Sequence, residues 1–320
     1  MRYDVVALGE LLIDFAEQGH GVDQYPIMAA HPGGAPANCL AALTACGKKT
    51  ALLGKVGQDM FGDMLVHTLC QSGIDSSGVV QDPSVFTTMA FVRFGPGGER
   101  EFSFARKPGA DASLTRDEVD LVKIENTRVF HFGTLSLCQE PSRAATRLAV
   151  EYAKEKNKLI TFDPNYRAPL WSDDHQARSQ ILWGLNQADV VKISDDEVEF
   201  LYECAPEKGA ARILQECGNQ KLVLITMGAK GCWYQTPYAK GFVPAFRVKS
   251  IDTTGAGDIF GGTVISGLID QPQKPWELHE KVIEQIVRYA SAVAGISTMH
   301  SGGISSVPST TRVLEFLASQ

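Results

Sequence analysis

The sequence predicts an α/β fold in which a doubly wound, mostly parallel sheet lies between helices and carries a small accessory β-sheet. Three observations support this prediction. Short apolar runs alternate with helix-length segments along the chain. Several of these runs are apolar at consecutive positions, as expected of strands that are buried on both faces of a parallel sheet. Two strand-like regions interrupt the alternation instead of following it, which indicates the accessory sheet.

The main sheet is predicted from β-branched or aliphatic runs. These are Val5–Leu8, Ala51–Val56, Val129–Phe132, Leu159–Phe162, Val190–Ile193 and Leu222–Thr226. The helices expected between them are Ala35–Cys46, Met60–Ser72, Ser142–Lys156, Gln176–Ala188 and Pro206–Cys217. Such β-α units join by right-handed crossovers. From Gly257 onward the pattern is largely helical.

The accessory sheet is predicted from three strand-like segments. Phe86–Phe94 and Glu101–Ala105 flank Gly95-Pro-Gly-Gly98, which is typical of a hairpin. Leu11–Phe15 is a further short apolar strand, and a polar, glycine-containing stretch follows it. We expect these segments to form a lid on one side of the main sheet.

One domain is expected to span residues 1–320, with the lid inserted as two segments at about 11–32 and 86–108. The length allows one large domain or two ordinary ones, and no internal repeat divides the chain. The lid strands are long for a freely exposed hairpin, and an open edge invites pairing. We therefore expect the lid sheet to form a homodimer contact as well.

Composition excludes several classes of protein. The content of 44% hydrophobic and 21% charged residues is ordinary for a globular protein, and the net charge of −7 argues against nucleic acid as a partner. Seven cysteines show no zinc-site spacing and read as reduced side chains. No signal-peptide layout and no apolar stretch near the ~20 residues of a membrane span are present, so a cytoplasmic location is expected.

The strongest chemical signal is the run Asp252-Thr-Thr-Gly-Ala-Gly-Asp258. Its glycine-rich turn, Gly255-Ala256-Gly257, precedes a segment that is apolar at helical intervals. A turn of this kind points backbone N–H groups at one spot with the positive end of the helix dipole behind them, which builds an anion hole. Asp258 would lie on its rim as a general base, kept ionised by the helix N-terminus. The alternative is that Asp258 serves only as the N-cap.

This run resembles the second signature of the ribokinase-type (PfkB) carbohydrate kinases, and earlier segments resemble the first. Gly9-Glu10-Leu-Leu-Ile-Asp14 and Gly33-Gly34-Ala-Pro-Ala-Asn38 match its first strand and substrate loop. The fructokinase branch matches best, through further stretches in chain order. These are Arg106-Lys-Pro-Gly-Ala-Asp111, His131-Phe-Gly-Thr134, Asp163-Pro-Asn-Tyr-Arg167, Lys192-Ile-Ser-Asp-Asp-Glu197 and Thr226-Met-Gly-Ala-Lys-Gly231.

The resemblance implies a ribokinase-like sandwich with a β-sheet lid and an ATP-dependent transfer of the γ-phosphoryl group to a primary hydroxyl of a sugar. Fructose is the first choice of acceptor. Two alternatives of the same class are 2-keto-3-deoxygluconate kinase and aminoimidazole riboside kinase, since their enzymes share much of this set of motifs. A different-class alternative is a non-catalytic sugar- or nucleotide-binding protein on the same fold, although such a protein has no need of a base at Asp258.

By the same resemblance, sugar hydroxyls would be held by Asp14, Gly33, Gly34 and Asn38. A carboxylate and an amide together accept and donate hydrogen bonds to a polyol. Arg106 and Arg167 are candidates to reach the sugar or the phosphates, because a planar donor fork fits an oxyanion. An arginine in such a position equally serves as a surface charge or as the partner of a buried carboxylate.

The nucleotide side is implied at residues that follow two late strands: Lys192, Ser194, Glu197, Thr226, Gly228 and Gly231. Glu197 would hold hydrated Mg²⁺, while a capping box of Ser194 and Glu197 at a helix start is the structural alternative. Asp252 and Thr254 would hold a monovalent cation, potassium in preference to sodium, unless Asp252 only tethers the loop. The adenine pocket is expected near the helix around Tyr289–Gly295.

Overall fold

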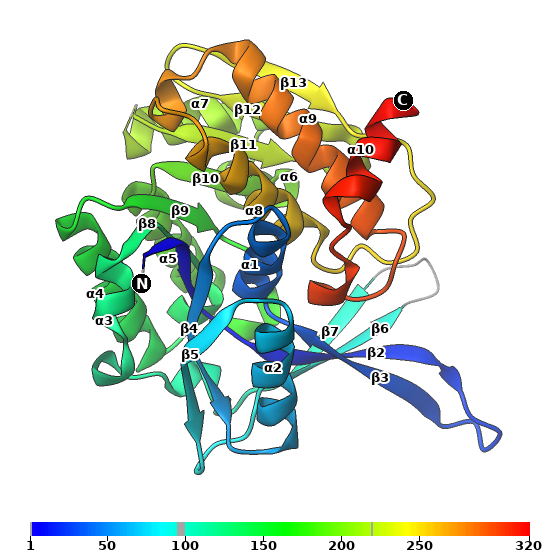
Figure 1. The fold of residues 1–320 in the computed structure, drawn as a ribbon. Coiled ribbons are helices and arrows are strands. Elements are labelled where there is room, and N and C mark those ends of the chain that lie inside the picture. The colour runs from blue at the N-terminus through cyan, green and yellow to red at the C-terminus, as the bar shows by residue number, and fades with distance from the viewer. Residues whose placement is uncertain (1, 95–99, 219) are drawn as a thin grey trace.

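The computed structural model describes residues 2–94, 100–218 and 220–320. Within them, the main sheet has nine strands in the order β13-β12-β11-β10-β9-β8-β1-β4-β5 (Figure 1). The strands from β11 to β5 run parallel, whereas β12 and β13 are antiparallel additions at one edge. Their bounds are β1 Tyr3–Leu8, β4 Thr50–Gly57, β5 Asp75–Asp82, β8 Thr127–Gly133, β9 Leu159–Asp163, β10 Val190–Ser194, β11 Leu222–Thr226, β12 Gly231–Gln235 and β13 Lys240–Pro244.

Helices cover both faces of this sheet (Figure 1). One face packs against α4, α5 and α7 through a single apolar cluster, and the other packs against α1, α2, α8 and α9. The bounds are α1 Ala35–Ala45, α2 Met60–Gln71, α3 Leu121–Glu125, α4 Ser142–Glu155, α5 Asp174–Gln187, α6 Asp195–Tyr202, α7 Pro206–Cys217, α8 Ala256–Ile269, α9 Glu280–Ser297 and α10 Thr310–Ala318. Strands with two covered faces explain the continuous apolar runs of the sequence.

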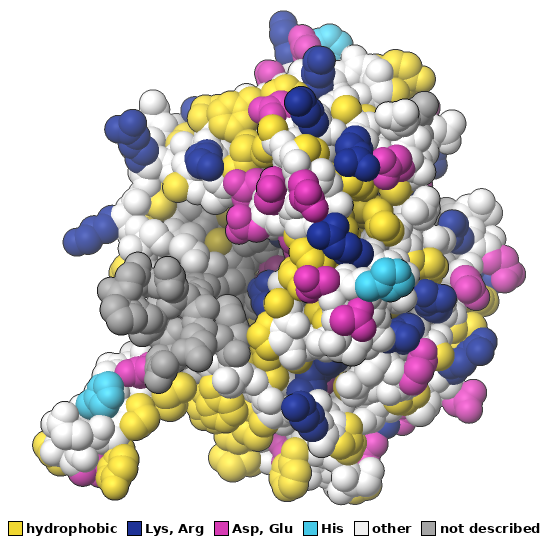
Figure 2. Space-filling view, turned by 180° about the vertical axis from the view of Figure 1, so that it is seen from behind, with side chains coloured by type: hydrophobic (Ala, Val, Ile, Leu, Met, Phe, Trp, Pro, Cys, Tyr) yellow, Lys and Arg dark blue, Asp and Glu magenta, His cyan; other side chains and the backbone are white. Residues whose placement is uncertain are grey.

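The second, smaller sheet has the strand order β3-β2-β6-β7 and contains the segments that were predicted to form a lid, so it is called the lid below. It consists of β2 Leu12–His20, β3 Pro26–Gly33, β6 Met89–Phe94 and β7 Arg100–Ala105. The hairpin β2–β3 projects away from the body of the molecule and carries exposed hydrophobic side chains (Figure 2). The turn predicted at Gly95–Gly98 lies outside the described residues, although β6 and β7 pair as an antiparallel ladder on either side of it.

The predicted α/β fold is therefore confirmed, and each predicted strand and helix of the main sheet occurs within a few residues of its expected bounds. Four strands were not predicted: β3, β5, β12 and β13. Among the described residues, no helix combines the length and the apolar character that crossing a bilayer requires.

The strand order places a topological switch between β1 and β8. From β1 the sheet grows through β4 to β5 on one side, and from β8 it grows through β9 and β10 on the other. In open α/β sheets, ligands bind outside the carboxyl ends of the strands at such a switch. The fold thus directs attention to the segments that follow β1, β8, β9 and β10.

Candidate active site

A cavity of about 210 Å³ lies at this position. It is bounded by the carboxyl ends of β1, β9 and β10, the N-termini of α1 and α8, and strands of the lid. Its lining residues include Glu10, Leu12, Asp14, Gly34, Asn38, Val92, Phe104, Leu135, Asn165, Arg167, Lys192, Ser194, Glu197, Thr254, Gly255, Gly257 and Asp258. The cavity therefore gathers most of the predicted catalytic and sugar-binding residues.

The N-terminus of α8 has the geometry that the glycine-rich turn predicted. Gly255 is the N-cap with φ of 73°, in the left-handed region where glycine is favoured. A Cβ atom at Gly255 would lie 3.0 Å from the Cα of Gly303, so the close approach also requires glycine. The N–H of Ala256 donates to the carbonyl of Thr253, and Gly257 lines the cavity. Unpaired N–H groups of a first helical turn are donors for an anion.

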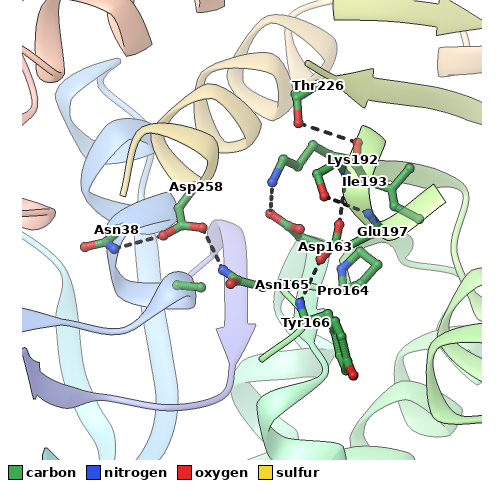
Figure 3. Close-up of polar contacts among 12 residues, drawn as sticks. Asn38, Asp163, Pro164, Asn165, Tyr166, Lys192, Ile193, Glu197, Thr226 and Asp258 are labelled. Carbon is green, nitrogen blue, oxygen red and sulfur yellow. Dashed lines mark hydrogen bonds and ion pairs between the residues drawn. The ribbon is translucent and has the colours of Figure 1, made fainter. Parts of the chain in front are cut away.

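Asp258 is the third residue of α8, so it is not the N-cap, and the alternative interpretation of this residue is wrong. Both of its carboxylate oxygens accept hydrogen bonds from amides: Asn38 Nδ2 donates to Oδ2 at 2.9 Å and Asn165 Nδ2 donates to Oδ1 at 2.9 Å (Figure 3). Burial, and then the charge of Asp163, raise the pKa of Asp258 to about 6, against the opposing effect of Lys192. The expected ionising effect of the helix is therefore outweighed, but the carboxylate stays mostly ionised at neutral pH.

Lys192 and Asp163 form a largely buried ion pair near Asp258, with the ammonium Nζ 2.8 Å from Asp163 Oδ2 (Figure 3). Burial alone would lower the pKa of Lys192, but the carboxylates of Asp163, Glu197 and Asp258 outweigh burial and raise it. A Cβ atom at Gly257 would lie 3.0 Å from this ammonium nitrogen, so the ammonium lies close to the first turn of α8. A fixed positive charge thus stands next to the anion hole.

Glu197 is the third residue of α6 and also lines the cavity. The capping box is present: Ser194 Oγ accepts from the N–H of Glu197, and Glu197 Oε2 accepts from the N–H of Ser194. Glu197 Oε1 accepts a third bond, from the N–H of Tyr166 at 2.7 Å (Figure 3). The carboxylate is thereby held in place, while its remaining lone pairs leave room for water or a metal-bound water.

On the sugar side, the lid and α1 meet. Asp14 on β2 lines the cavity, and a Cβ atom at Gly33 would lie 2.2 Å from its Oδ2, so glycine is required there for the carboxylate to fit. Gly34 has φ of 118° and begins α1. Asn38 follows one turn later. One N–H of its amide donates to Asp258, and its buried Oδ1 has no hydrogen-bond partner in the described chain, so this oxygen and the second N–H remain for a ligand.

The two candidate arginines have different surroundings. Arg167 lines the cavity, and its charge lowers the pKa of Asp258. Arg106 is 5% exposed, and it is not among the described residues that line the cavity. Its Nη2 lies 2.7 Å from Asp111 Oδ2 and also donates to the carbonyl of Leu135. Arg106 is therefore the partner of a buried carboxylate in this structure, and its contact with sugar or phosphate stays a prediction.

A second cavity, of about 410 Å³, adjoins the first and shares Thr253 and Gly257 with it. Thr226, Gly228 and Gly231, which were expected to face the nucleotide, all line it. The remaining lining is more apolar. It comes from the loop after β13, from α8 and from α9 with its C-cap, and includes Phe246, Val248, Phe260, Ser291, Ala294, Gly295 and Thr298. Tyr289, at the start of the expected adenine segment, lines a different cavity.

The predicted cation residues tether the loop before α8. Asp252 Oδ1 accepts hydrogen bonds from the N–H and the hydroxyl of Thr254, and Oδ2 accepts from the N–H of Gly302. The structural alternative for Asp252 is thus observed, and cation binding stays a prediction. Within residues 2–94, 100–218 and 220–320, no group of three or more His, Cys, Asp or Glu side chains could hold a metal by itself.

Three residues of the site were not singled out from the sequence: Glu10, Asp163 and Asn165. Glu10 is 3% exposed and accepts the N–H of Ala35 at the start of α1, and burial raises its pKa to about 8. Asp163 and Asn165 belong to the motif Asp163-Pro-Asn-Tyr-Arg167, in which only Arg167 was predicted to contact a ligand. Asp163 and Asn165 could have been predicted from their position directly after a run that is predicted as a buried strand, because ligands bind at that edge of the sheet.

The chain matches the model of the pfkB family carbohydrate kinases over residues 2–310. It is 40% identical to fructokinase-1 of Zea mays over 98% of this chain and 97% of that protein, and 41% identical to fructokinase-2 of Solanum lycopersicum over 98% and 95%. A fructokinase of Xylella fastidiosa with bound ATP superposes with a TM-score of 0.90 at 28% identity, covering 100% of this chain and 99% of that one. A fructokinase of Vibrio cholerae with fructose, ADP and calcium superposes at 0.87 and 30%, covering 98% and 99%. The chain belongs to the pfkB family of carbohydrate kinases.

Proposed function

We propose that this kinase transfers the γ-phosphoryl group of ATP to the 6-hydroxyl of D-fructose, yielding fructose 6-phosphate and ADP. The observation that carries the proposal is the junction of the two cavities at Gly257, with the Asp258 carboxylate one residue further along α8. The polar cavity suits a sugar and the larger, more apolar cavity suits a nucleotide. Relatives that share about 40% of the sequence are named fructokinases.

The residues at the junction provide the parts that phosphoryl transfer needs. Asp258 would accept the proton of the attacking hydroxyl, because its carboxylate lies on the sugar side of the anion hole. The first-turn amides of α8 and the Lys192 ammonium would stabilise negative charge on the transferred group. Val92 and Phe104 of the lid close the cavity from the other side and would exclude water, which competes as an acceptor.

A divalent metal, Mg²⁺ in our proposal, would arrive with the nucleotide. Mg²⁺ is usually bound through one or two carboxylates, several waters and the phosphates of the substrate. Glu197 faces the cavity, and the described chain has no preformed cluster of acidic metal ligands, which fits binding of the ion through water. When bound, the ion would neutralise charge on the phosphates.

Acceptor specificity is tested with a coupled ADP-release assay over a panel that contains fructose, 2-keto-3-deoxygluconate and aminoimidazole riboside. We expect the highest kcat/KM with fructose. A higher value with either other acceptor would assign the chain to that activity instead. Absence of ADP release with all acceptors, together with saturable ATP binding, would favour the non-catalytic binding protein.

Further parts of the proposal concern the surroundings of the enzyme. Asp252 and Thr254 would bind potassium beside the loop before α8, so activity should be higher in potassium than in sodium. Equal activity in the two salts would contradict the site.

We also propose a homodimer through the lid. We further propose a cytoplasmic location, which the free state of all seven cysteines supports. Nucleic acid and membranes are not expected partners.

A further inference from the structure

The base is held from two sides of the molecule. Asn38 lies on α1, and Asn165 lies in the loop after β9, yet their amide nitrogens reach the two oxygens of one carboxylate (Figure 3). A carboxylate rotates readily about its terminal bond when nothing restrains it. Two donors at 2.9 Å, one for each oxygen, fix the plane of the Asp258 carboxylate. Each oxygen keeps a further lone pair for another donor.

The backbone of Asn165 is in an unusual conformation that aims its side chain. Its φ is 47°, in the left-handed region, which asparagine tolerates better than other residues with a Cβ atom. Both neighbours are fixed: the carbonyl of Pro164 accepts from the N–H and the hydroxyl of Thr134, and the N–H of Tyr166 donates to Glu197. A conformation that costs energy and is held by its surroundings is often found where it serves function.

From this geometry we propose that Asn165 is a positioning residue of the reaction, which orients the Asp258 carboxylate toward the attacking sugar hydroxyl. The inference rests on the proposed function, since it assigns Asn165 to the base of that reaction. An amide suits the task because it donates a hydrogen bond without carrying charge. It therefore fixes the carboxylate at a smaller cost in basicity than an ammonium at the same distance would impose.

Charged and titratable groups surround the base on every packed element. Asp163 is the last residue of β9, Arg167 comes from the same loop as Asn165, and Lys192 comes from β10. Glu10 at the end of β1 and Cys39 on α1 also interact with the charge of Asp258. Since this set remains unchanged when only Asn165 is replaced, a change in the titration of Asp258 reports the loss of the amide.

Three variants distinguish the effect of the amide donor from the effect of the left-handed backbone conformation. Asn165→Gly permits the left-handed conformation but removes the donor, whereas Asn165→Asp keeps the shape and places an acceptor against Asp258 Oδ1. Asn157→Gly is the matched control, because Asn157 also has a left-handed φ, 53°, but is exposed in the turn after α4. The control should have the turnover number and the KM values of the unchanged enzyme.

We expect Asn165→Gly to lower kcat about 10- to 100-fold, as small misplacements of a catalytic group do, with KM for ATP within about twofold. Asn165→Asp should lower kcat by a larger factor than Asn165→Gly. The acid limb of the kcat profile should move to higher pH in both, since a donor that favours the ionised form is gone. Wild-type kcat and an unmoved profile in Asn165→Gly would overturn the inference, as would losses that merely follow a fall in thermal stability.

A second measurement needs no turnover. In ¹³C NMR spectra of the free enzyme, the carboxyl signal of Asp258, assigned by its absence in Asp258→Asn, should titrate at higher pH in Asn165→Gly than in the unchanged protein and in Asn157→Gly. Equal titration in all three would overturn the role of Asn165 even if no sugar were phosphorylated. An inactive unchanged enzyme with the expected NMR shift would instead defeat the proposed function alone.

Discussion

At the scale of single residues, the proposed role of Asp258 as the base predicts that its pKa sets the acid limit of the reaction. Burial and the charge of Asp163 raise this pKa to about 6. A general base must be deprotonated, so activity is full above pH 7 and falls as the pH falls through about 6, by about tenfold per unit well below it. Measurements of kcat/KM between pH 5 and 8 check this prediction, because kcat/KM reports the pKa of the free enzyme, and a flat profile down to pH 5 would contradict it.

Glu197 has an observed role in the capping box of α6 and a proposed role at the metal, and one substitution separates the two. In Glu197→Gln the single remaining carbonyl oxygen cannot accept both backbone bonds as before, so a stability loss of about 1 kcal/mol is expected. If the carboxylate also orients metal-bound water, the variant needs more Mg²⁺ and turns over more slowly, with KM for fructose nearly unchanged. Activity as a function of Mg²⁺ concentration and urea denaturation measure the two effects.

The control for this variant is Glu118→Gln. Glu118 closes the other capping box of this kind that the described chain shows, with Thr115, and it also contacts Lys55 outside the active cavity. It should lose stability but keep the Mg²⁺ dependence of the unchanged enzyme. The same Mg²⁺ dependence in Glu197→Gln would mean that Glu197 only caps α6.

The sequence predicted the residues of the cavity where a motif marks them, but not the partners that the fold supplies. Asp258 and Gly255 stand in a glycine-rich run whose chemistry is local. The amide of Asn165 matters only because its loop reaches the start of α8, 93 positions further along the chain. The ion pair of Arg106 with Asp111 depends on the path of the intervening loop, which the motif itself does not specify.

At the scale of elements, the lid is anchored where it joins the body. Asp111 lies in a short helical turn, Asp111–Ser113, and its carboxylate binds both chain segments that lead into the β6–β7 hairpin. It accepts a hydrogen bond from Thr88, just before β6, and pairs with Arg106, just after β7. Arg106 and Asp111 are each 5% exposed, so the pair has little water around it.

Replacement of Asp111 should therefore destabilise the base of the lid. Asp111→Asn leaves the Arg106 guanidinium buried without its opposite charge, and breaking a buried pair costs about 3–5 kcal/mol. Urea denaturation measures the loss, and Asp117→Asn, a change at an exposed aspartate nearby, should leave stability within about 0.5 kcal/mol. A loss below 1 kcal/mol in Asp111→Asn would show that the pair does not anchor the lid.

The four strands that the sequence did not predict lie at the edge of a sheet or next to it. β5 is a polar edge strand with burial on one side only, and β3 begins with proline and has another proline near its end, which reads as an argument against a strand. β12 and β13 are short and follow a glycine turn that resembles a ligand loop. The central parallel strands were predictable because both of their faces are covered, which leaves a continuous apolar run.

At the scale of the whole molecule, the lid presents apolar side chains to solvent. Ile27 on the edge strand β3 is 53% exposed, and Tyr25 and Val22 in the same hairpin are also exposed. A homodimer would cover this surface. Light scattering at micromolar concentration should give twice the mass of one chain, and a fully active monomer would contradict the prediction.

A charged residue in that surface should separate the two copies. Ile27→Asp is expected to yield monomers. Phe242→Asp is the matched control, because Phe242 is 46% exposed on β13, the edge strand of the main sheet, and its replacement should leave the dimer intact. Dissociation by both variants, or by neither, would place the contact elsewhere.

The role of Asp258 as the base is tested most directly by Asp258→Asn, which keeps the size of the side chain and removes the basic oxygen. With ATP and the preferred sugar, kcat should fall by about 10²–10⁴-fold, while binding of both substrates changes much less. Asp270→Asn, at the exposed C-terminal end of the same helix, should retain full turnover. An Asp258→Asn enzyme that keeps more than about a tenth of wild-type kcat, well above that range, would mean that another group is the base.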